Sequence, residues 1–301
     1  MDNGEKLIRK LGFNRVKLNE PMGSHTWIKV GGPADYYYEA EAESELVEAV
    51  QTAIELQIPF HTIGLGANVL FSDKGFRGLI IVNKTSQIKF LPHDFVEVDS
   101  GVNIVNLTRE AANRGLGGLE RLTKVPATVG GAIFMNAGDT GKGEFFGDLV
   151  VSIKIINKEG EIKKLFSEDA NFTYRTSRFQ ESGETILSAK LKLMKMTKLE
   201  IDEKVKDILL RKTHHPAGPS VGSTFRNPEG APAGAVIDQC GLKGPVVCGA
   251  KISEQHANFI INSGNARAAD IKELINLMKH SVKEKFGIEL KEEVRYLGDW
   301  S

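Results

Sequence analysis

The chain has 301 residues, 41% hydrophobic and 26% charged, which is typical of a globular protein with room for two domains. Lys and Arg together number 39, as do Asp and Glu, so the formal net charge is zero and does not favour a nucleic-acid partner. Cys240 and Cys248 are too few for a disulfide framework. The opening residues lack a signal-peptide core, and no run of about 18 apolar residues predicts a membrane span. We therefore expect a cytoplasmic protein that does not associate with membranes.

The first half of the chain predicts interleaved helices and strands. Apolar residues of 44–54 recur on one helical face, and Ser44 is a suitable N-cap. The pattern then predicts strands at 60–64 and 78–83, a hairpin at 88–101 that turns at 92–94, and a short helix at 105–115 that Gly115 ends.

From Val150 the predicted strands become longer. A hairpin is expected at 150–166, and residues 185–193 alternate strictly, which is typical of a sheet with one solvated face. A boundary near 196–200 precedes a helix with Ile201, Val205, Ile208 and Leu209 on its apolar face, a Gly- and Pro-rich stretch at 214–234, an amphipathic helix at 269–286 ended by Gly287, and a closing strand at 288–298. Because regular β-α-β alternation does not persist, the pattern predicts an α+β fold.

Three glycine clusters lie between regular elements and are candidates for binding phosphate. Gly64 and Gly66 begin like a Rossmann fingerprint, but Val69 occupies the third glycine position. The pair Gly141-Lys142 is followed by glycine, so it does not form a P-loop. In the third cluster, residues 130–131 are expected to present free N–H groups at a helix start. The histidines show no zinc-ligand spacing, so the sequence predicts no metal site.

Seven segments resemble, in order, the UDP-N-acetylenolpyruvoylglucosamine reductase family, flavoenzymes of peptidoglycan precursor synthesis. Gly64–Asp73 resembles the flavin-pyrophosphate loop, and Gly115–Gly138 resembles the second flavin segment. The other matching segments are HTWIKVGGPAD, YRTSRF, GSTFRNP, GLKGPVVCGAKISEQHANFIIN and ELKEEVRYLG. One such motif is weak evidence, but seven in the family's order cover nearly the whole chain.

The resemblance implies an α+β architecture with a two-lobed FAD-binding domain of the PCMH type and a smaller α+β substrate domain. We expect an N-terminal segment at 1–30, the FAD-binding domain at 31–196 and the substrate-binding domain at 197–301, whose final strand returns to the active site. Little is inserted between Phe225 and Cys240. The chain therefore resembles the shorter family type, which lacks the substrate-covering tyrosine loop.

The resemblance also implies the reaction. NADPH reduces FAD, and hydride from the flavin then saturates the enolpyruvyl ether of a UDP-sugar to give UDP-N-acetylmuramate, in a protein expected to be monomeric. By motif, the implied catalytic residues are Arg175, Ser223 and Glu293, and the implied substrate contacts are Tyr174, His214 and Asn227. The residues implied to bind the cofactor are Gly64, Gly66, Ala67, Asn68, Val69, Pro126, Thr128, Val129, Gly130, Gly131, Asn136 and Ala137.

The three catalytic residues suit chemistry at a double bond conjugated to a carboxylate. Hydride addition places negative charge on the neighbouring carbon and carboxylate, and Arg175 offers a planar cation that matches this group. Ser223 lacks the second glycine and the histidine of a nucleophilic serine, so it is expected to donate a proton to the strongly basic carbon. Glu293 would be repelled as a carboxylate, so it is expected to hold or share a proton.

Three positions depart from the family pattern. Asp139-Thr140 stands where Ala-Tyr is usual, and Ala127 stands where glycine is usual. His214 lies near a position that is often lysine and is thought to meet the substrate pyrophosphate. Because a histidine is mostly neutral at pH 7, weaker nucleotide affinity that improves at lower pH is expected. His256 matches the family's S-E-x-H-A-N-F motif as a packing or hydrogen-bonding residue.

Two other functions remain open at this point. Another FAD-dependent oxidoreductase of the PCMH fold would act on a different small molecule, and such enzymes often tether flavin through a histidine or cysteine. Neither GLGANV nor VGGAIF contains one. A non-catalytic nucleotide-binding module is the third possibility, and the retention of all three catalytic residues disfavours it.

Overall fold

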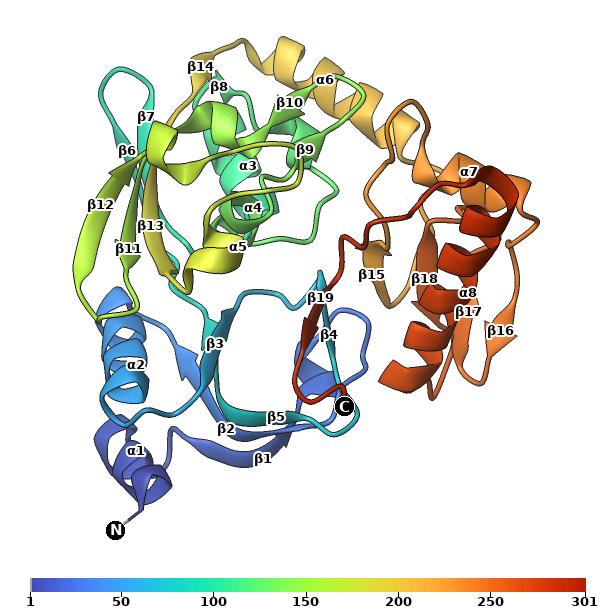
Figure 1. Ribbon diagram of the computed structural model, residues 1–301. Coiled ribbons are helices and arrows are strands. Elements are labelled where there is room, and N and C mark those ends of the chain that lie inside the picture. The colour runs from blue at the N-terminus through green and yellow to red at the C-terminus, as the bar shows by residue number, and fades with distance from the viewer. Residues whose placement is uncertain (1) are drawn as a thin grey trace. The chain divides into compact units, whose positions relative to one another are not determined.

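The computed structural model describes residues 2–301, and Figure 1 shows their helices and strands. The α-helices are α1 (Asn3–Leu11), α2 (Glu43–Glu55), α3 (Ile104–Ala112), α4 (Val129–Phe134), α5 (Phe179–Ser182), α6 (Lys198–Arg211), α7 (Ala233–Gln239) and α8 (Ala268–Phe286). The 3-10 helices are η1 (Met22–His25), η2 (Glu120–Leu122), η3 (Phe146–Leu149) and η4 (Ser167–Ala170). Within these residues, no helix combines the length and hydropathy needed to cross a bilayer.

The strands are mostly short. They are β1 (Lys17–Pro21), β2 (Pro33–Ala40), β3 (Phe60–Ile63), β4 (Val69–Phe71), β5 (Phe76–Asn83), β6 (Ile88–Leu91), β7 (Phe95–Asp99), β8 (Leu116–Gly117), β9 (Gly138–Asp139), β10 (Glu144–Phe145), β11 (Val150–Ile156), β12 (Ile162–Phe166), β13 (Thr185–Lys192), β14 (Met194–Lys195), β15 (Ser220–Ser223), β16 (Val246–Val247), β17 (Ala250–Ile252), β18 (Phe259–Asn262) and β19 (Arg295–Leu297). The α+β class predicted from the sequence is therefore confirmed.

The chain divides into two compact units, each made of several segments. The first contains Met1–Lys17, Tyr37–Gly64 and Leu79–Thr213, and the second contains Leu18–Tyr36, Leu65–Gly78 and His214–Ser301. Helix α6 belongs to the first unit, whereas the sequence-based division at residues 196 and 197 assigns it to the C-terminal domain. The second unit also takes two segments from the first third of the chain, which no local pattern indicated.

The first unit has its core on an antiparallel five-stranded sheet with the order β12-β11-β13-β7-β6. The alternation in β13 is confirmed, because Leu187, Ala189 and Leu191 are buried. Helices α3 and α4 contribute Leu107 and Ile133 to the same hydrophobic cluster. In a second sheet, of order β1-β2-β5-β3, strand β3 pairs in parallel with β5, as Phe60↔Leu79 to Ile63↔Val82.

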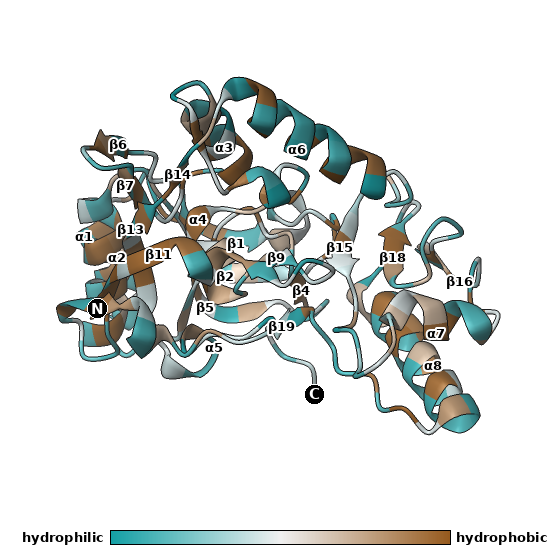
Figure 2. Cartoon of the chain, turned by 90° about the horizontal axis from the view of Figure 1, so that it is seen from above, coloured by the Kyte–Doolittle hydropathy of each residue, from teal (hydrophilic) through white to brown (hydrophobic). Residues whose placement is uncertain are grey.

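The second unit packs α7 and α8 with an antiparallel sheet of order β15-β18-β17-β16. Figure 2 shows hydrophobic and hydrophilic residues alternating along α8, whose buried stripe includes Ile271, Leu274, Ile275, Met278 and Val282. Gly287 ends the helix at φ +70°, as expected. At the other end, both carboxylate oxygens of Asp73 accept hydrogen bonds of 2.9 Å from the N–H groups of Ala268 and Ala269.

Several local predictions were wrong in detail. Helix α2 begins at Glu43 after the N-cap Ala42, so Ser44 lies inside the first turn and does not cap it. Leu209 on α6 is 42% exposed and does not join the buried face. The closing strand is regular only at Arg295–Leu297, where it pairs in parallel with β4. Residues 291–293 pair with a different segment, residues 224–226.

Candidate active site

Arg175 lies in a tight turn of the first unit. The backbones of Thr173 and Thr176 exchange two hydrogen bonds of 3.1 Å, and Arg175 between them adopts φ +55°. Arg175 Nη2 donates to the carbonyl oxygen of Gly138 at 3.1 Å. The carbonyl oxygen of Arg175 accepts from Gln180 Nε2 at 3.0 Å. A non-glycine residue at positive φ is strained, so surrounding contacts must hold this conformation.

Asn136 supplies much of that support. Its side chain is buried, its Nδ2 donates to the carbonyl oxygen of Thr173 at 2.9 Å, and its Oδ1 accepts from Gly147 N–H at 2.9 Å. Both ends of the amide are thus used to join the Arg175 turn to η3. The sequence predicts Asn136 as a cofactor contact, but the visible task of its side chain is to position the turn. Ala137 beside it is also buried.

Positive charge gathers near Arg175 in the first unit. Arg211 pairs with Asp139 at 2.6 Å; burial raises the pKa of Asp139, but the guanidinium outweighs it and holds the pKa below its usual range. Burial lowers the pKa of Lys212, and the nearby Arg175 lowers it further. Lys212 Nζ donates to the carbonyl oxygen of Arg121 at 3.2 Å.

Sequence reasoning missed Lys212 as part of this group. The departure at Asp139 anchors the β9–β10 hairpin, whose Gly138 accepts from Arg175, to the end of α6. Arg175, Arg211 and Lys212 face two carboxylates, because Asp207 also pairs with Arg211 at 3.1 Å. The positive charge that remains suits an anionic substrate. The only signal in the sequence was the position of Lys212, two residues before His214 in a motif already singled out.

The segment that follows Ser223 pairs with the segment that carries Glu293 in the second unit. The N–H of Glu293 donates to the carbonyl oxygen of Thr224 at 2.8 Å, and Arg226 N–H donates to Lys291 O at 2.9 Å. Residues Phe225 and Glu292 form an antiparallel bridge between these segments. The structure therefore joins, through backbone hydrogen bonds, two motifs whose predicted catalytic residues are 70 residues apart in the chain.

A bulge in the β15–β18 pair sets the local path of Ser223. Ser220 pairs with Ile261 and Ser223 with Phe259, with a register shift between them, and Gly222 takes φ +73° there. The Ser223 side chain is partly exposed, and its hydroxyl donates no hydrogen bond to the other described residues. That hydroxyl is therefore available to an incoming group.

Asn68 links the predicted flavin-pyrophosphate loop to the segment carrying Glu293. Its Nδ2 donates to the carbonyl oxygen of Glu293 at 3.0 Å, and its own carbonyl oxygen accepts from Arg295 N–H at 2.9 Å. The next residue, Val69, starts β4 and pairs with Arg295. Asn68 thus fixes the backbone on both sides of Val294, and this bond explains why the chain needs an amide here.

The loop at residues 64–68 has the properties of an anion cradle. Gly66 adopts φ +61°, and a Cβ there would lie 2.4 Å from the carbonyl oxygen of His25, so only glycine fits. Among the described residues, the backbone N–H groups of 65–68 donate to no protein acceptor. Clustered free N–H groups in such a turn favour phosphate, so the residues present fit the diphosphate of FAD.

The start of α4 does not have these properties, and the prediction that its glycines present free N–H groups was wrong. Val129 N–H donates to Val102 O at 2.9 Å, Gly130 N–H to Ser100 O at 2.8 Å, and Gly131 N–H to Thr128 Oγ1 at 3.2 Å. All three donors are thus already used. The two predicted flavin segments are nevertheless in contact, because a Cβ on Gly64 would lie 2.5 Å from Thr128 Oγ1.

The remaining predicted residues have different surroundings. Tyr174 packs against Phe145 with ring centroids 6.1 Å apart. Asn227 Oδ1 accepts from Ala233 N–H at 3.0 Å and so helps to start α7. Pro126 is partly exposed in the loop before α4, and His214 is exposed beside two other histidines.

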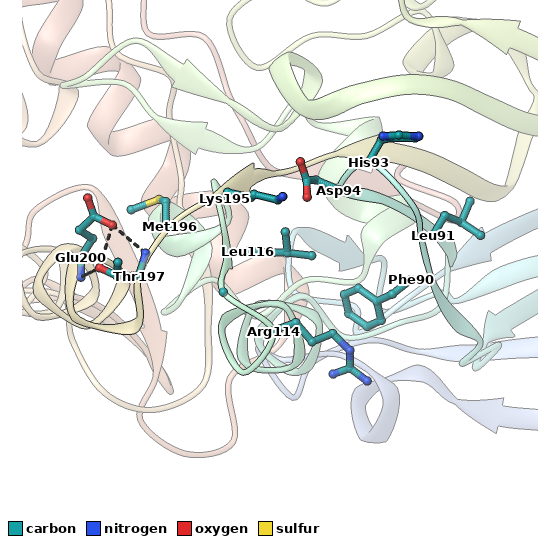
Figure 3. A pocket seen from close by; sticks show the side chains of 11 residues that line it. Phe90, Leu91, His93, Asp94, Arg114, Leu116, Lys195, Met196, Thr197 and Glu200 are labelled. Atoms are coloured by element: carbon teal, nitrogen blue, oxygen red, sulfur yellow. Dashed lines mark hydrogen bonds between the residues drawn. The ribbon is translucent and has the colours of Figure 1, made fainter.

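A groove of about 580 Å³ lies elsewhere in the first unit, between the β6–β7 turn, the end of α3 and the start of α6. Figure 3 shows its lining side chains, including Arg114 beside Phe90 and Glu200 bonded to Thr197. None of the predicted catalytic or cofactor residues lines this groove. It is therefore not the site predicted from the sequence.

Comparisons with known proteins agree with the geometry. Two family models match, an FAD binding domain at residues 34–165 and the C-terminal domain of UDP-N-acetylenolpyruvoylglucosamine reductase at residues 211–297. Reductases of that name from Carboxydothermus hydrogenoformans and Chlamydia muridarum are 39% and 40% identical, over 98% and 94% of this chain and the same shares of theirs. The crystal structure of UDP-N-acetylenolpyruvylglucosamine reductase (MurB) from Thermus caldophilus matches with a TM-score of 0.81 and 32% identity, over 94% of this chain and 98% of that one. The chain therefore belongs to the UDP-N-acetylenolpyruvoylglucosamine reductase family.

Proposed function

We propose that this chain reduces UDP-N-acetyl-3-O-(1-carboxyvinyl)-glucosamine to UDP-N-acetylmuramate, with NADPH as reductant and FAD as cofactor. The pairing of residues 224–226 with 291–293 supports the proposal, because it joins the segment that follows the proposed proton donor Ser223 to the segment that carries Glu293. FAD, when bound, supplies the two-electron chemistry that joins NADPH oxidation to reduction of the double bond. Its diphosphate is held by the amides of the 65–68 loop.

The protein residues divide the remaining work. Arg175, held by Asn136 and Gly138, offers its guanidinium to the carboxylate that receives the developing charge. Ser223 Oγ gives a proton to the carbon next to that carboxylate. Glu293, carrying or sharing a proton, donates a hydrogen bond to the same developing charge. Lys212 and Arg211 add positive charge for the anionic substrate.

The direct test follows NADPH oxidation by the purified, FAD-loaded protein with and without the enolpyruvyl UDP-sugar. Sugar-dependent oxidation with formation of UDP-N-acetylmuramate is expected. A yellow protein that oxidises NADPH at the same rate with and without the sugar would instead indicate another flavoenzyme of this fold. A protein that takes up no FAD would indicate a module without redox activity.

The enzyme is further proposed to act as a monomer in the cytoplasm, the compartment that holds NADPH. Sedimentation of the FAD-loaded protein at assay concentration is expected to give a mass near 33.0 kDa.

A further inference from the structure

Three histidines of the second unit gather at one place although they come from two separate segments. His214 and His215 lie in the loop between α6 and β15, and His256 lies in the turn between β17 and β18. One ring nitrogen from each residue lies within 4.8 Å of the others. Neither the proposed proton transfers nor the flavin loop uses this trio as a unit.

The rings lie at distances that a metal ion can bridge after one of them turns. Their centroids are separated by 4.8 Å for His214–His215, 5.2 Å for His214–His256 and 5.6 Å for His215–His256. His215 lies edge-on to the other two rings, whereas His214 is stacked on His256 at 19°, so the exposed His214 ring has to turn before all three face one ion. Three imidazoles bound tetrahedrally at Zn–N distances of about 2.0–2.1 Å have centroids roughly 5 Å apart. His214 is exposed and the other two are partly buried, which leaves the fourth position of such an ion open to solvent.

The surrounding protein fixes the buried side of the cluster. The backbone N–H of His256 donates to Ser253 Oγ at 3.3 Å. The His256 ring packs against α7, where a Cβ on Gly234 would lie 2.5 Å from the ring atom Cε1. Phe259 lies against both His215 and His256, with centroids 5.1 and 4.9 Å away. Two rings are therefore positioned before any ion arrives, and only His214 must adjust in solvent.

We propose that His214, His215 and His256 form a binding site for a divalent transition-metal ion of the zinc class. Imidazole ligands favour Zn²⁺, Cu²⁺ and Ni²⁺ over Mg²⁺ and Ca²⁺, which prefer oxygen ligands. Asn258 N–H donates to His256 Nδ1 at 3.2 Å, so the proton of this ring is on Nε2 without metal. Coordination through Nε2 moves that proton to Nδ1 and releases the Asn258 amide from its acceptor.

The test uses the full-length, FAD-loaded protein after removal of any affinity tag and treatment with a chelator. Equilibrium dialysis against ZnCl₂ is expected to give one tightly bound Zn²⁺ per chain, with none retained from MgCl₂. Co²⁺ at the same site is expected to show the intense visible bands of tetrahedral coordination. Hydrogen exchange at the Asn258 amide is expected to accelerate when Zn²⁺ binds.

Substitutions identify the ligands. His214→Asn changes an exposed side chain and is expected to leave folding intact while weakening Zn²⁺ binding at least about 10-fold. His256→Asn is expected to have a similar effect, with far-UV circular dichroism as the folding check. The matched control is His280→Asn, because His280 is exposed on α8 and lies outside the cluster.

Two results would overturn the proposal. Equal Zn²⁺ affinity of the parent protein and His214→Asn would exclude His214 as a ligand. Equal loss in His214→Asn and His280→Asn would mean scattered surface binding. None of these readouts depends on turnover. A failure of the metal-site proposal would therefore not count against the proposed reductase activity, which the NADPH oxidation assay tests separately.

Discussion

At the residue scale, the proposed mechanism sets Glu293 beside a substrate carboxylate, and a proton shared between the two groups would remove their repulsion. Glu293→Gln keeps a neutral hydrogen-bond donor of the same shape, whereas Glu293→Ala removes it. We expect Glu293→Gln to retain at least about 10-fold more turnover than Glu293→Ala, since one donor to developing charge contributes several kcal/mol. Steady-state kcat of both variants checks this. Equal losses would contradict the neutral-donor role.

Ser223 acts only in the second half of the proposed reaction, and this separates its chemistry from cofactor binding. Ser223→Ala is expected to leave flavin reduction by NADPH unchanged and to slow flavin reoxidation by the UDP-sugar by about 10²–10⁴-fold, the usual contribution of a positioned acid. Stopped-flow absorbance measures the two half-reactions separately. Ser263→Ala is the control, because Ser263 is exposed and its Oγ donates to Gly249 O. Equal slowing of both half-reactions would contradict the assignment.

The motif order predicted which segments pair better than the glycine pattern predicted residue surroundings. The motif order singled out Ser223 and Glu293, and the structure pairs residues 224–226 with 291–293. The prediction of free N–H groups failed for Gly130 because its acceptor, Ser100 O, lies 30 residues earlier in the chain, and for Gly131 because the side chain of the N-cap Thr128 accepts from it. Whether an N–H is free depends on tertiary contacts, which a glycine pattern does not contain.

At the element scale, one buried amide couples the Arg175 turn to η3. Asn136→Ala removes one of the two hydrogen bonds to Thr173 O, which still accepts from Thr176 N–H, and leaves the partly buried Gly147 N–H without its acceptor, which costs about 1–3 kcal/mol. We expect the free energy of unfolding to fall by that amount and the sugar half-reaction to slow, because Arg175 loses its support. Urea unfolding and stopped-flow absorbance check the two effects. Asn113→Ala at the exposed end of α3 is the control. If it lowers stability and slows the sugar half-reaction as much as Asn136→Ala does, the positioning role of Asn136 is contradicted.

The flavin loop depends on the shape of one turn. Gly66→Ala puts a methyl group 2.4 Å from His25 O at φ +61°, so the loop must move away from its cradle shape. We expect FAD retention to fall at least about 10-fold, because the phosphate-facing amides lose their alignment. Flavin absorbance after gel filtration measures this.

Gly183→Ala is the matched control for that change. Gly183 ends α5 at φ +70°, and nothing lies within 4 Å of the position of an added Cβ. The control therefore carries the same backbone strain without a clash and without the loop. If Gly183→Ala loses as much FAD as Gly66→Ala, general destabilisation explains the result.

Elements with a strong period were predictable, and short ones were not. The stripe of α8 and the alternation of β13 determine a buried face by themselves, so both were correct. The closing strand was predicted over 288–298, but its backbone pairs first with 224–226 and then with β4. A hydrophobic pattern does not show that a segment changes its pairing partner along its length. Because the partner changes between residues 293 and 295, only the residues of β19 form a regular strand.

At the scale of the whole molecule, the sequence did not predict which distant segments belong to the same unit. The second unit takes residues 18–36 and 65–78 from the start of the chain, and Asp73 from one of them caps α8. Composition and turns give no sign of this exchange, so the predicted boundary fell before α6. The histidine trio was missed for the same reason, because His256 is 41 residues beyond His215 and matches no ligand spacing.

Acid stability is the last property that belongs to the molecule as a whole. Hydrogen bonds from Arg15 lower the pKa of Glu45 to about 2 in the first unit. In the second, burial raises the pKa of Glu292, but Lys279 at 2.8 Å, Tyr296 and Lys272 together outweigh burial and lower the pKa overall. A carboxyl whose folded pKa is depressed stabilises the fold above its unfolded pKa of about 4.3 and loses that contribution as pH falls.

The contribution of these two carboxyls to the free energy of unfolding is therefore expected to be constant from about pH 7 to pH 5 and to fall between about pH 4 and pH 2. Each of Glu45→Gln and Glu292→Gln should lower stability at pH 7 by about 0.5–1 kcal/mol and reduce the acid slope, while converging with the parent near pH 2. Urea unfolding at each pH measures both effects. Glu168→Gln is the control, because Glu168 is exposed and forms no ion pair among the described residues. A parent slope that neither carboxyl substitution reduces would place the acid sensitivity outside these two ion pairs.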